Sequence, residues 1–350
     1  MTTVLVTGGC GFIGSHFVRL LLERTGWRIV NVDNLTYAGD LERVATSGRD
    51  ERYRFVKGDI ADRAGLQTLC AEERPWAVVN FAAESHVDRS ILDAAPFLHA
   101  NVLGVQSLLE VAREYSVERF VQISTDEVYG DLAEGVRASE DSPLRPSSPY
   151  AASKAAADLL CLAYRRTYGL PILITRSSNN YGPWQFPEKL IPLLIRNALA
   201  GETLPLYGDG MQQRDWLYVA DNSEAILAVL DRGKVGAIYN VAAGRERTNV
   251  EVAQALRQTL AEAAGSALGS GVPDICFTPD RPGHDRRYAI DAGRIRRELA
   301  WAPRVSFEEG MVRTVGWYLE HRDWVERVCS GAYMDYHADV YGRHWTHGVP

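Results

Sequence analysis

Residues Thr3 to Gly14 read Thr-Val-Leu-Val-Thr-Gly-Gly-Cys-Gly-Phe-Ile-Gly, a short apolar run that leads into a glycine-rich turn. The residues from Ser15 to Glu23 then carry apolar side chains at helical spacing. We therefore expect a strand, a tight turn and a helix, in this order. Gly8, Gly11 and Gly14 would let the backbone approach a pyrophosphate, whose charge the first N–H groups and the dipole of the helix would stabilise.

A second strand is expected from Arg28 to Asp33, and its last residue is an acid that lies 19 positions after Gly14. A glycine motif alone is weak evidence. A strand before it, a helix after it and an acid at this distance are together typical of a dinucleotide site. The Asp33 carboxylate would accept hydrogen bonds from the adenine ribose hydroxyls and would repel a 2′-phosphate. The sequence therefore predicts NAD as the cofactor, rather than NADP.

Strands and helices continue to alternate along the first half of the chain. Further strands are expected at 53–57, 77–81, 119–124 and 172–175, with helices such as 66–73 and 97–115 between them. This order predicts an α/β fold with a doubly wound parallel (Rossmann) sheet and a smaller C-terminal substrate-binding lobe. Ligands of such sheets bind at the carboxyl ends of the strands, so three motifs should share one crevice. They are Gly58-Asp59-Ile60, Phe81-Ala82-Ala83-Glu84-Ser85-His86 and Thr125-Asp126-Glu127. For Asp59, an adenine contact and a helix cap in front of Asp62 are both open.

A polar loop leads to Pro149 and then to Tyr150-Ala-Ala-Ser-Lys154. If Pro149 opens a helix, the i, i+4 spacing stacks Tyr150 and Lys154 on one face. A cation beside the phenol would lower the pKa of the tyrosine towards the working pH and make it a usable acid or base. A surface tyrosine above a surface lysine is the alternative interpretation.

The composition changes after Arg176, where residues 177–192 are rich in turn formers and polar side chains. We expect an NAD-binding domain over residues 1–178, with segments around 214–243 returning to its sheet as strands 214–219 and 237–241. Residues 179–213 and 244–350 would form the second lobe. In that lobe the guanidinium groups of the basic loop 280–287 could clamp a diphosphate, and a solvated charge run is the alternative.

Two predicted helices, 97–115 and 150–168, carry apolar residues on more than the one face that packs on a sheet. The surplus face requires a partner. Two helices from each of two subunits would close a four-helix bundle, which predicts a symmetric homodimer. Burial of the same face under the second lobe is the alternative.

The bulk composition narrows the class of protein. The formal charge of -7 gives no basic surface of the kind that nucleic-acid-binding proteins use, and no apolar run approaches the roughly 18 residues of a membrane span. Five scattered cysteines without a Cys-x-x-Cys pair indicate neither a disulfide framework nor a metal site. We expect a soluble, cytoplasmic protein that binds no metal, no nucleic acid and no membrane.

The combination of Thr-Gly-Gly-x-Gly-Phe-Ile-Gly, Thr125 and Tyr150-x-x-x-Lys154 resembles the extended short-chain dehydrogenase/reductase family, which acts on nucleotide sugars. Six further segments are similar to the 4,6-dehydratases of that family, and the similarity spans nearly the whole chain. They are Ala83 to Ser90, Ile123 to Gly130, Asn179 to Pro183, Phe186 to Pro192, Asp280 to Asp291 and Ser330 to Tyr333. Two residues depart from the family pattern: Ala100 stands where a threonine near the cofactor is common, and Cys10 replaces a small alanine.

This resemblance implies a role for each residue of a site. The catalytic residues would be Thr125, Asp126, Glu127, Tyr150 and Lys154. The cofactor-binding residues would be Gly8, Gly11, Phe12, Ile13, Gly14, Asp33, Asn34, Asp59, Ile60, Phe81, Ala82, Ala83, Ser85, Tyr150, Lys154 and Asn180. The substrate-binding residues would be Ser85, Thr125, Asn179, Lys189, Leu190, Pro205, Tyr207, Arg214, Asn249, Arg281 and His284.

The implied reaction is the dehydration of dTDP-glucose to dTDP-4-keto-6-deoxyglucose. It combines transient C4 oxidation with bound NAD, elimination of water across C5 and C6, and return of the hydride to C6. Oxidation needs one base, which Tyr150 supplies, so Asp126 and Glu127 are surplus in a simple dehydrogenase. As an acid and a base they suit the elimination, provided that one is protonated and the other ionised. Adjacent residues of a regular strand face opposite sides, so both reach one site only if the backbone turns after Ser124.

Two rival functions stay open. A nucleotide-sugar 4-epimerase shares the cofactor, the Tyr–Lys pair and the ketone intermediate, but it needs no acid–base pair at C5 and C6. A non-catalytic NAD-sensing protein would not need Tyr150 and Lys154, and their presence argues against it. The fold alone does not separate these functions, because one sheet hosts all three.

Overall fold

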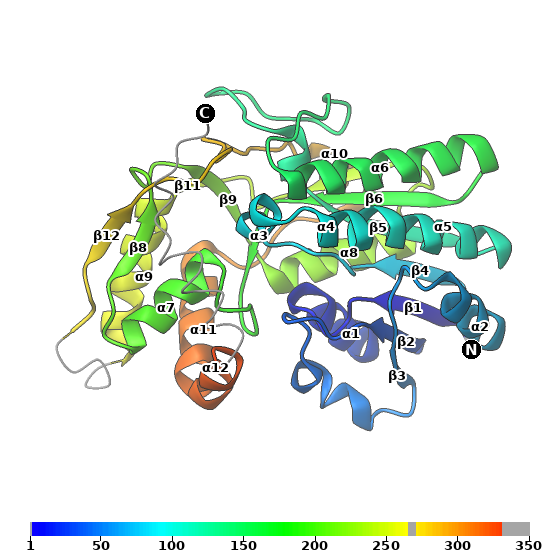
Figure 1. Ribbon diagram of the computed structural model, residues 1–350, viewed down its shortest axis with the longest axis horizontal. Helices are drawn as coiled ribbons and strands as arrows, with labels where there is room; N and C mark the ends of the chain where they lie inside the picture. The colour runs from blue at the N-terminus through cyan, green and yellow to red at the C-terminus, as the bar shows by residue number, and fades with distance from the viewer. Residues whose placement is uncertain (1, 265–270, 331–350) are drawn as a thin grey trace.

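The computed structural model describes residues 2–264 and 271–330 of the chain, so the predicted motif residue Tyr333 lies outside the described residues. Seven parallel strands form the main sheet in the order β10-β6-β5-β4-β1-β2-β3 (Figure 1). Their bounds are β1 Thr3–Thr7, β2 Arg28–Asp33, β3 Tyr53–Lys57, β4 Ala77–Asn80, β5 Arg119–Thr125, β6 Ile172–Ser177 and β10 Ile238–Val241. The predicted α/β fold with a parallel Rossmann sheet is therefore confirmed.

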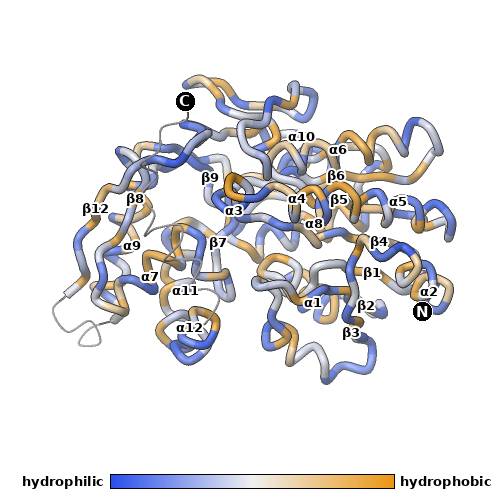
Figure 2. Tube along the Cα trace, in the orientation of Figure 1, coloured by the Kyte–Doolittle hydropathy of each residue, from blue (hydrophilic) through white to orange (hydrophobic). Residues whose placement is uncertain are grey.

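Helices cover both faces of this sheet, because successive side chains of a strand point to opposite sides. In β1, Val4 and Val6 pack in one apolar cluster and Leu5 packs in another. The first cluster includes α1 (Phe12–Arg24), α8 (Val219–Arg232) and α10 (Gly293–Leu299). The second includes α2 (Arg63–Glu73), α5 (Val105–Glu114) and α6 (Pro149–Tyr168). Figure 2 shows hydrophobic stretches among the helices and strands of this unit, next to hydrophilic ones. This three-layer unit is the larger lobe.

The smaller lobe has its own apolar core, separate from the two layers of the larger lobe. It is built on the parallel pair β8 (Leu204–Tyr207) and β12 (Ile275–Thr278). The helices α7 (Leu190–Leu199), α9 (Asn249–Ala264), α11 (Phe307–Glu320) and α12 (Arg322–Val328) lie on the same side of the molecule in Figure 1.

A third sheet has the order β11-β9-β7, with bounds β7 Asn179–Tyr181, β9 Gln213–Tyr218 and β11 Glu246–Thr248. The expected return of segment 214–243 to the main sheet is correct for β10 and wrong for β9. Strand β9 pairs instead with β7 in parallel and with β11 antiparallel. The carboxylate of Asp215 on β9 accepts hydrogen bonds from the N–H groups of Ala243, Gly244 and Arg245 at 2.8, 2.6 and 2.8 Å. These bonds turn the chain after β10, so that β11 runs antiparallel to β9.

The local start of α6 follows from its sequence. The Ser148 hydroxyl accepts a hydrogen bond from the Ala151 N–H at 3.1 Å, and Pro149 occupies the first turn. Gly169 ends the helix with φ of 71°. Tyr150 and Lys154 therefore lie in the first turns of a 20-residue helix, as the spacing predicts.

The predicted helix 97–115 is present but is not regular. It consists of α4 (Ala95–Leu98), a π-helical segment from His99 to Gly104 (η3) and α5. The buried Asn101 in this segment donates hydrogen bonds to the Glu84 carbonyl at 2.9 Å and to Ser153 Oγ at 2.8 Å. The widened turn thus places an amide between the end of β4 and the start of α6.

An apolar face remains exposed on α4, η3 and α6, which contact one another. Leu98, Leu103 and Leu159 are 53%, 56% and 57% exposed. Burial of this face under the smaller lobe, one of the two alternatives, is therefore wrong for the described part of the chain. None of the helices in residues 2–264 and 271–330 has the length and hydropathy that a membrane span requires.

Candidate active site

A cavity of about 700 Å³ opens along the carboxyl ends of the strands of the main sheet. The carboxyl ends of β1 to β6 all contribute to its wall, as expected for a doubly wound sheet. Every residue predicted to bind the cofactor lines it. The five predicted catalytic residues, Thr125, Asp126, Glu127, Tyr150 and Lys154, line the same cavity.

The glycine turn after β1 packs so closely against neighbouring backbone that side chains would not fit there. Gly8 has φ of 70°, and a Cβ atom on it would lie 2.5 Å from the Ala82 nitrogen. A Cβ atom on Gly14 would lie 2.3 Å from the Gly8 carbonyl oxygen. No side chain caps the N-terminus of α1. Its first N–H groups therefore suit the pyrophosphate of a dinucleotide, so the residues present fit NAD.

Two acids lie further along the strand ends. Asp33 Oδ2 accepts from the Cys10 N–H at 2.9 Å, which ties the end of β2 to the glycine turn. Burial raises the pKa of Asp33, while hydrogen bonds from the backbone oppose the shift. Asp59 does not cap α2, because Asp62 does so through the Gly65 N–H at 3.1 Å. Of the two alternatives for Asp59, the helix cap is therefore wrong.

The chain turns directly after β5. Thr125 is the last residue of the strand, and Asp126 to Tyr129 form a 3-10 helix (η4). The Thr125 hydroxyl accepts from the Glu127 N–H at 3.3 Å and donates to Asp126 Oδ1 at 3.2 Å. The sequence required a turn of the backbone after Ser124 if Asp126 and Glu127 were to share a site. This turn is present, and both residues line one cavity.

Tyr150 and Lys154 are buried, with 8% and 5% of their surfaces exposed, so the alternative of a surface pair is wrong. Lys154 Nζ donates to the Ile123 carbonyl at 2.7 Å, which holds the ammonium group against the end of β5. The Tyr150 ring packs on Phe97 with 6.3 Å between ring centroids. The pair thus lies inside the cavity beside the carboxyls.

The Tyr150 pKa is raised, which is opposite to the lowering expected from Lys154. Burial raises the pKa of Tyr150 well above its ordinary value, and the charges of Glu127 and Asp126 raise it further. Among the stronger influences, only a hydrogen bond with Thr125 lowers the pKa of Tyr150. Burial also lowers the pKa of Lys154 to about 8, which weakens the cation that was expected to act on the phenol.

Burial and nearby charges shift the pKa values of the two carboxyls, Asp126 and Glu127, away from those of ordinary acids. Burial, and then the neighbouring Glu127, raise the pKa of Asp126 to about 8. Burial also raises the pKa of Glu127, but Arg281, Arg214 and Lys189 all oppose that shift. Asp126 is therefore protonated at neutral pH, while the cations around Glu127 favour its ionised form.

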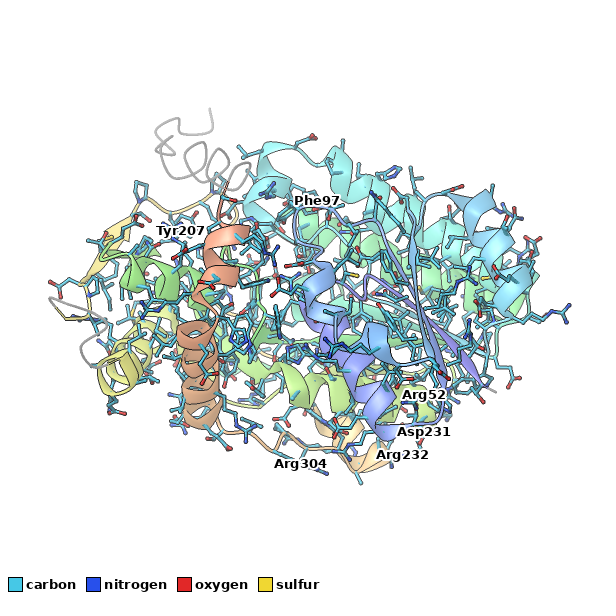
Figure 3. The ribbon with its side chains drawn as sticks, turned by 90° about the horizontal axis from the view of Figure 1, so that it is seen from below. Arg52, Phe97, Tyr207, Asp231, Arg232 and Arg304 are labelled. Carbon is cyan, nitrogen blue, oxygen red and sulfur yellow. The ribbon has the colours of Figure 1, made fainter. Side chains whose placement is uncertain are left out.

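A second cavity of about 160 Å³ continues from the first into the smaller lobe, and Glu127 lines both. Nine predicted substrate-binding residues line it, whereas Ser85 and Thr125 line only the larger cavity. The nine are Asn179, Lys189, Leu190, Pro205, Tyr207, Arg214, Asn249, Arg281 and His284. Tyr207 belongs to β8 of the smaller lobe, whereas Phe97 belongs to the larger lobe (Figure 3).

The basic loop 280–287 has two parts, one that lines the second cavity and one that forms ion pairs outside it. Arg281 and His284 line the second cavity, which favours the clamp interpretation for this part of the loop. Arg286 and Arg287 line neither cavity. Arg286 pairs with Asp209 at 2.7 Å, and Arg287 pairs with Glu246 at 2.6 Å. For these two the clamp interpretation is wrong.

Arg43 is a wall residue that sequence reasoning missed. Its buried side chain lines the larger cavity and donates to the carbonyls of Cys10 and Trp184 at 3.0 Å each. Its guanidinium lies 5.4 Å from the ring of Trp324 on α12. These partners are far apart in the chain, and no local pattern indicates that an arginine of a short 3-10 helix is buried.

The two departures from the family pattern have different positions. Ala100 lines the larger cavity, so a hydroxyl at this point would face a ligand. Cys10 is buried, and its sulfur accepts a hydrogen bond from Asn31 Nδ2 at 3.4 Å. In the described ranges, no group of three or more His, Cys, Asp or Glu side chains could hold a metal ion.

Comparison with known proteins identifies the family of this chain. The family model described as GDP-mannose 4,6 dehydratase matches residues 5–314. A dTDP-glucose 4,6-dehydratase of Xanthomonas campestris is 51% identical over 343 residues, which cover 95% of this chain and 97% of that protein.

Solved structures of the same family are also similar to this chain. The crystal structure of DesIV, a dTDP-glucose 4,6-dehydratase from Streptomyces venezuelae with NAD and TYD bound, has a TM-score of 0.88 at 48% identity. The match covers 93% of this chain and 100% of the DesIV chain. A Thermus thermophilus UDP-glucose 4-epimerase in complex with NAD has a TM-score of 0.82 at 37% identity, with 91% and 100% covered. With a family model over most of its length and a relative at 51% identity, the chain belongs to the GDP-mannose 4,6 dehydratase family, part of the extended short-chain dehydrogenases/reductases.

Proposed function

We propose that this protein is an NAD-dependent hydro-lyase that converts dTDP-glucose to dTDP-4-keto-6-deoxyglucose. The observation that carries the proposal is the arrangement at the end of β5. A protonated carboxyl, Asp126, and a carboxyl surrounded by cations, Glu127, line the cavity that also holds Tyr150 and Lys154. A simple oxidation uses only the last two, so the carboxyls indicate an elimination.

Tyr150, as its phenolate, accepts the proton of the C4 hydroxyl while the hydride leaves C4, and the C4 oxygen stays a ketone in the product. NAD, when bound, supplies the acceptor for the C4 hydride and the donor that returns it to C6. The C4 ketone makes the C5 hydrogen acidic, and Glu127 removes it. Asp126 then protonates the C6 hydroxyl as it leaves, so water departs without an unstable hydroxide. When the hydride arrives at C6, Glu127 gives the proton that it took from C5 back to C5. The proton on Tyr150 replaces the one that Asp126 gives to the departing water.

The two cavities support a placement for each part of the substrate. The glucosyl group lies at Glu127, where the cavities meet, and the nucleoside diphosphate extends into the smaller one. Two cations of that cavity suit a diphosphate: Arg214, which is buried, and Arg281, whose side chain is 16% exposed. We accordingly assign residues 1–178, with the returning part of 214–243, to NAD binding, and 179–213 with 244–350 to the nucleotide sugar.

A nucleotide-sugar 4-epimerase is the second candidate, because the Thermus enzyme has the same fold and cofactor. Epimerisation requires Tyr150 and a ketone but gives Asp126 and Glu127 no task. The larger share of identity with the dehydratases, 48% against 37% among the solved structures compared, also favours dehydration.

We also propose that the protein is a cytoplasmic homodimer. The exposed leucines of α4, η3 and α6 form a continuous apolar face on packed helices, and the same face of a second copy would cover it in a four-helix bundle.

Analytical ultracentrifugation of the wild type and of Leu103→Glu tests this dimer. A charge on the apolar face should convert the dimer to a monomer with an unchanged circular dichroism spectrum. Val312→Glu, an equally exposed position on α11 (55%), should leave the dimer intact. A wild-type monomer, or dissociation by both variants, would contradict the proposal.

Mass spectrometry of the products from dTDP-glucose and UDP-glucose tests the reaction. We expect the dTDP-sugar to lose one water and the UDP-sugar to react more slowly, because elimination lowers the mass whereas epimerisation does not. A product of unchanged mass with an inverted C4 centre would establish the epimerase instead.

Variants of Asp126 and Glu127 should uncouple the steps. In Glu127→Gln the base for C5 is lost, so exchange of the C5 hydrogen with solvent deuterium should fall roughly 10²- to 10⁴-fold. In Asp126→Asn the C5 exchange should persist while loss of water slows by a similar factor. Single-turnover mass spectrometry in deuterated water follows both steps, and Tyr150→Phe, which should stop both, is the control. Unimpaired dehydration in both carboxyl variants would show that the carboxyls have no catalytic role.

The pH dependence should separate the same steps. Asp126 carries its proton below its pKa of about 8 and loses it above, so loss of water should slow relative to C5 exchange as the pH rises from 7 to 9. The ratio of the two rates removes the contribution of Lys154, which titrates in the same range but acts before both steps. In Asp126→Asn the ratio should be low at every pH. A ratio that is constant in the wild type would contradict the role of Asp126 as the acid.

A further inference from the structure

One buried carboxylate of the larger lobe faces the second cavity and has no task in the proposed reaction. Asp88, in the first turn of α3 (Val87–Leu92), is 2% exposed and lines this cavity. Its Oδ1 accepts from Arg281 Nη1 at 2.6 Å, and its Oδ2 accepts from the Tyr207 hydroxyl at 3.0 Å. Both partners belong to the smaller lobe and both line the cavity. Asp88 therefore holds two side chains across the boundary between the lobes.

The cavity takes a dianion in the proposed function, so a carboxylate in its wall requires an explanation. Burial alone would raise the pKa of Asp88, but Arg281, His86 and Tyr207 outweigh it and keep the pKa below its ordinary value. Asp88 is thus ionised and repels a diphosphate by its charge. A residue that opposes the ligand electrostatically must contribute through the groups that it holds.

The two arginines of the cavity differ in how they are held. Arg214 donates to the backbone carbonyls of Gln213 and Asp285 at 2.8 Å each, and its guanidinium stacks 4.1 Å from the Tyr288 ring. Its own lobe fixes it. Arg281 has its ion pair with Asp88, and its buried Nε has no hydrogen-bond partner among the described residues. The direction of this guanidinium therefore depends on the larger lobe.

We propose that Asp88 is a positioning residue for the nucleotide diphosphate: it orients Arg281 and Tyr207, so that the diphosphate site is complete only when the two lobes are in contact. This inference rests on the proposed function, because it assigns the second cavity to a nucleoside diphosphate. It adds a residue that acts through two of the predicted substrate-binding residues.

The test is calorimetric titration of the NAD-loaded protein with dTDP and with thymidine, in the wild type and in Asp88→Asn. The variant keeps the size of the side chain but can accept with one oxygen only. We expect the Kd for dTDP to rise about tenfold or more, with the Kd for thymidine and the NAD content unchanged. Tighter dTDP binding would show that Asp88 acts only as a charge, and equal losses for dTDP and thymidine would show a general structural role. Either result overturns the proposal.

A double-mutant cycle identifies the path of the effect. Because Asp88 acts through Arg281 as well as Tyr207, the loss of dTDP affinity in the double variant Asp88→Asn/Arg281→Gln should be smaller than the sum of the losses in the two single variants. Additive losses would overturn the proposal. Asp209→Asn is the matched control, because it breaks the ion pair of Arg286 on the same loop, outside the cavity, and should leave dTDP binding unchanged.

The wild-type titration also separates this inference from the proposed function. It includes dTDP, UDP and GDP. If UDP or GDP binds and dTDP does not, the proposed substrate is refuted. The Asp88 and Arg281 variants would then be titrated with the diphosphate that binds and with its own nucleoside. A drop in affinity confined to that diphosphate would still support the positioning role, and an equal drop for the nucleoside would overturn it.

Discussion

A single buried guanidinium holds the two halves of the reaction centre together. Arg176, on β6, donates to Asp158 Oδ2 at 2.8 Å and to the Tyr129 hydroxyl at 2.8 Å. Asp158 lies one helical turn after Lys154 on α6, and Tyr129 ends the 3-10 helix that begins with Asp126. Tyr129 in turn donates to Asn240 Oδ1 on β10 at 2.8 Å. Because an unpaired buried charge is costly, this network admits one arrangement of the helix that carries Tyr150 and the turn that carries the carboxyls.

Burial in the same region sets the chemistry of the site. Removal from water raises the pKa of Asp126 and lowers the pKa of Lys154, in each case by disfavouring the charged form. Glu127 lies in the same desolvated place, but Arg281, Arg214 and Lys189 act on it from the side of the second cavity. An acid and a base thus arise from two adjacent carboxyls because three cations oppose the effect of burial at Glu127, whereas at Asp126 the charge of Glu127 adds to burial and outweighs Arg214.

The site lies between two apolar cores, and polar contacts join the lobes around it. Lys189 Nζ donates to the Ser85 carbonyl at 2.7 Å, and Asp88 pairs with Arg281. On the far side of the larger cavity, Trp324 Nε1 and Arg327 Nη2 donate to Asp40 Oδ2 at 2.8 Å each. The parallel sheet is common to enzymes of many functions. The specific chemistry depends on which side chains the smaller lobe brings to its edge.

The sequence by itself determined the parallel sheet, the glycine turn, the acid at Asp33 and the Tyr150–Lys154 spacing, because each follows from local periodicity or a short motif. It also placed the candidate cofactor and substrate residues, which two adjoining cavities bring together. Only the tertiary structure decided that β9 leaves the main sheet, because its partners β7 and β11 are remote from it in the chain. It also decided the buried position of Arg43 and the pKa of Tyr150. Burial, unlike spacing, depends on residues that are remote in the chain, so no local pattern could reveal these features.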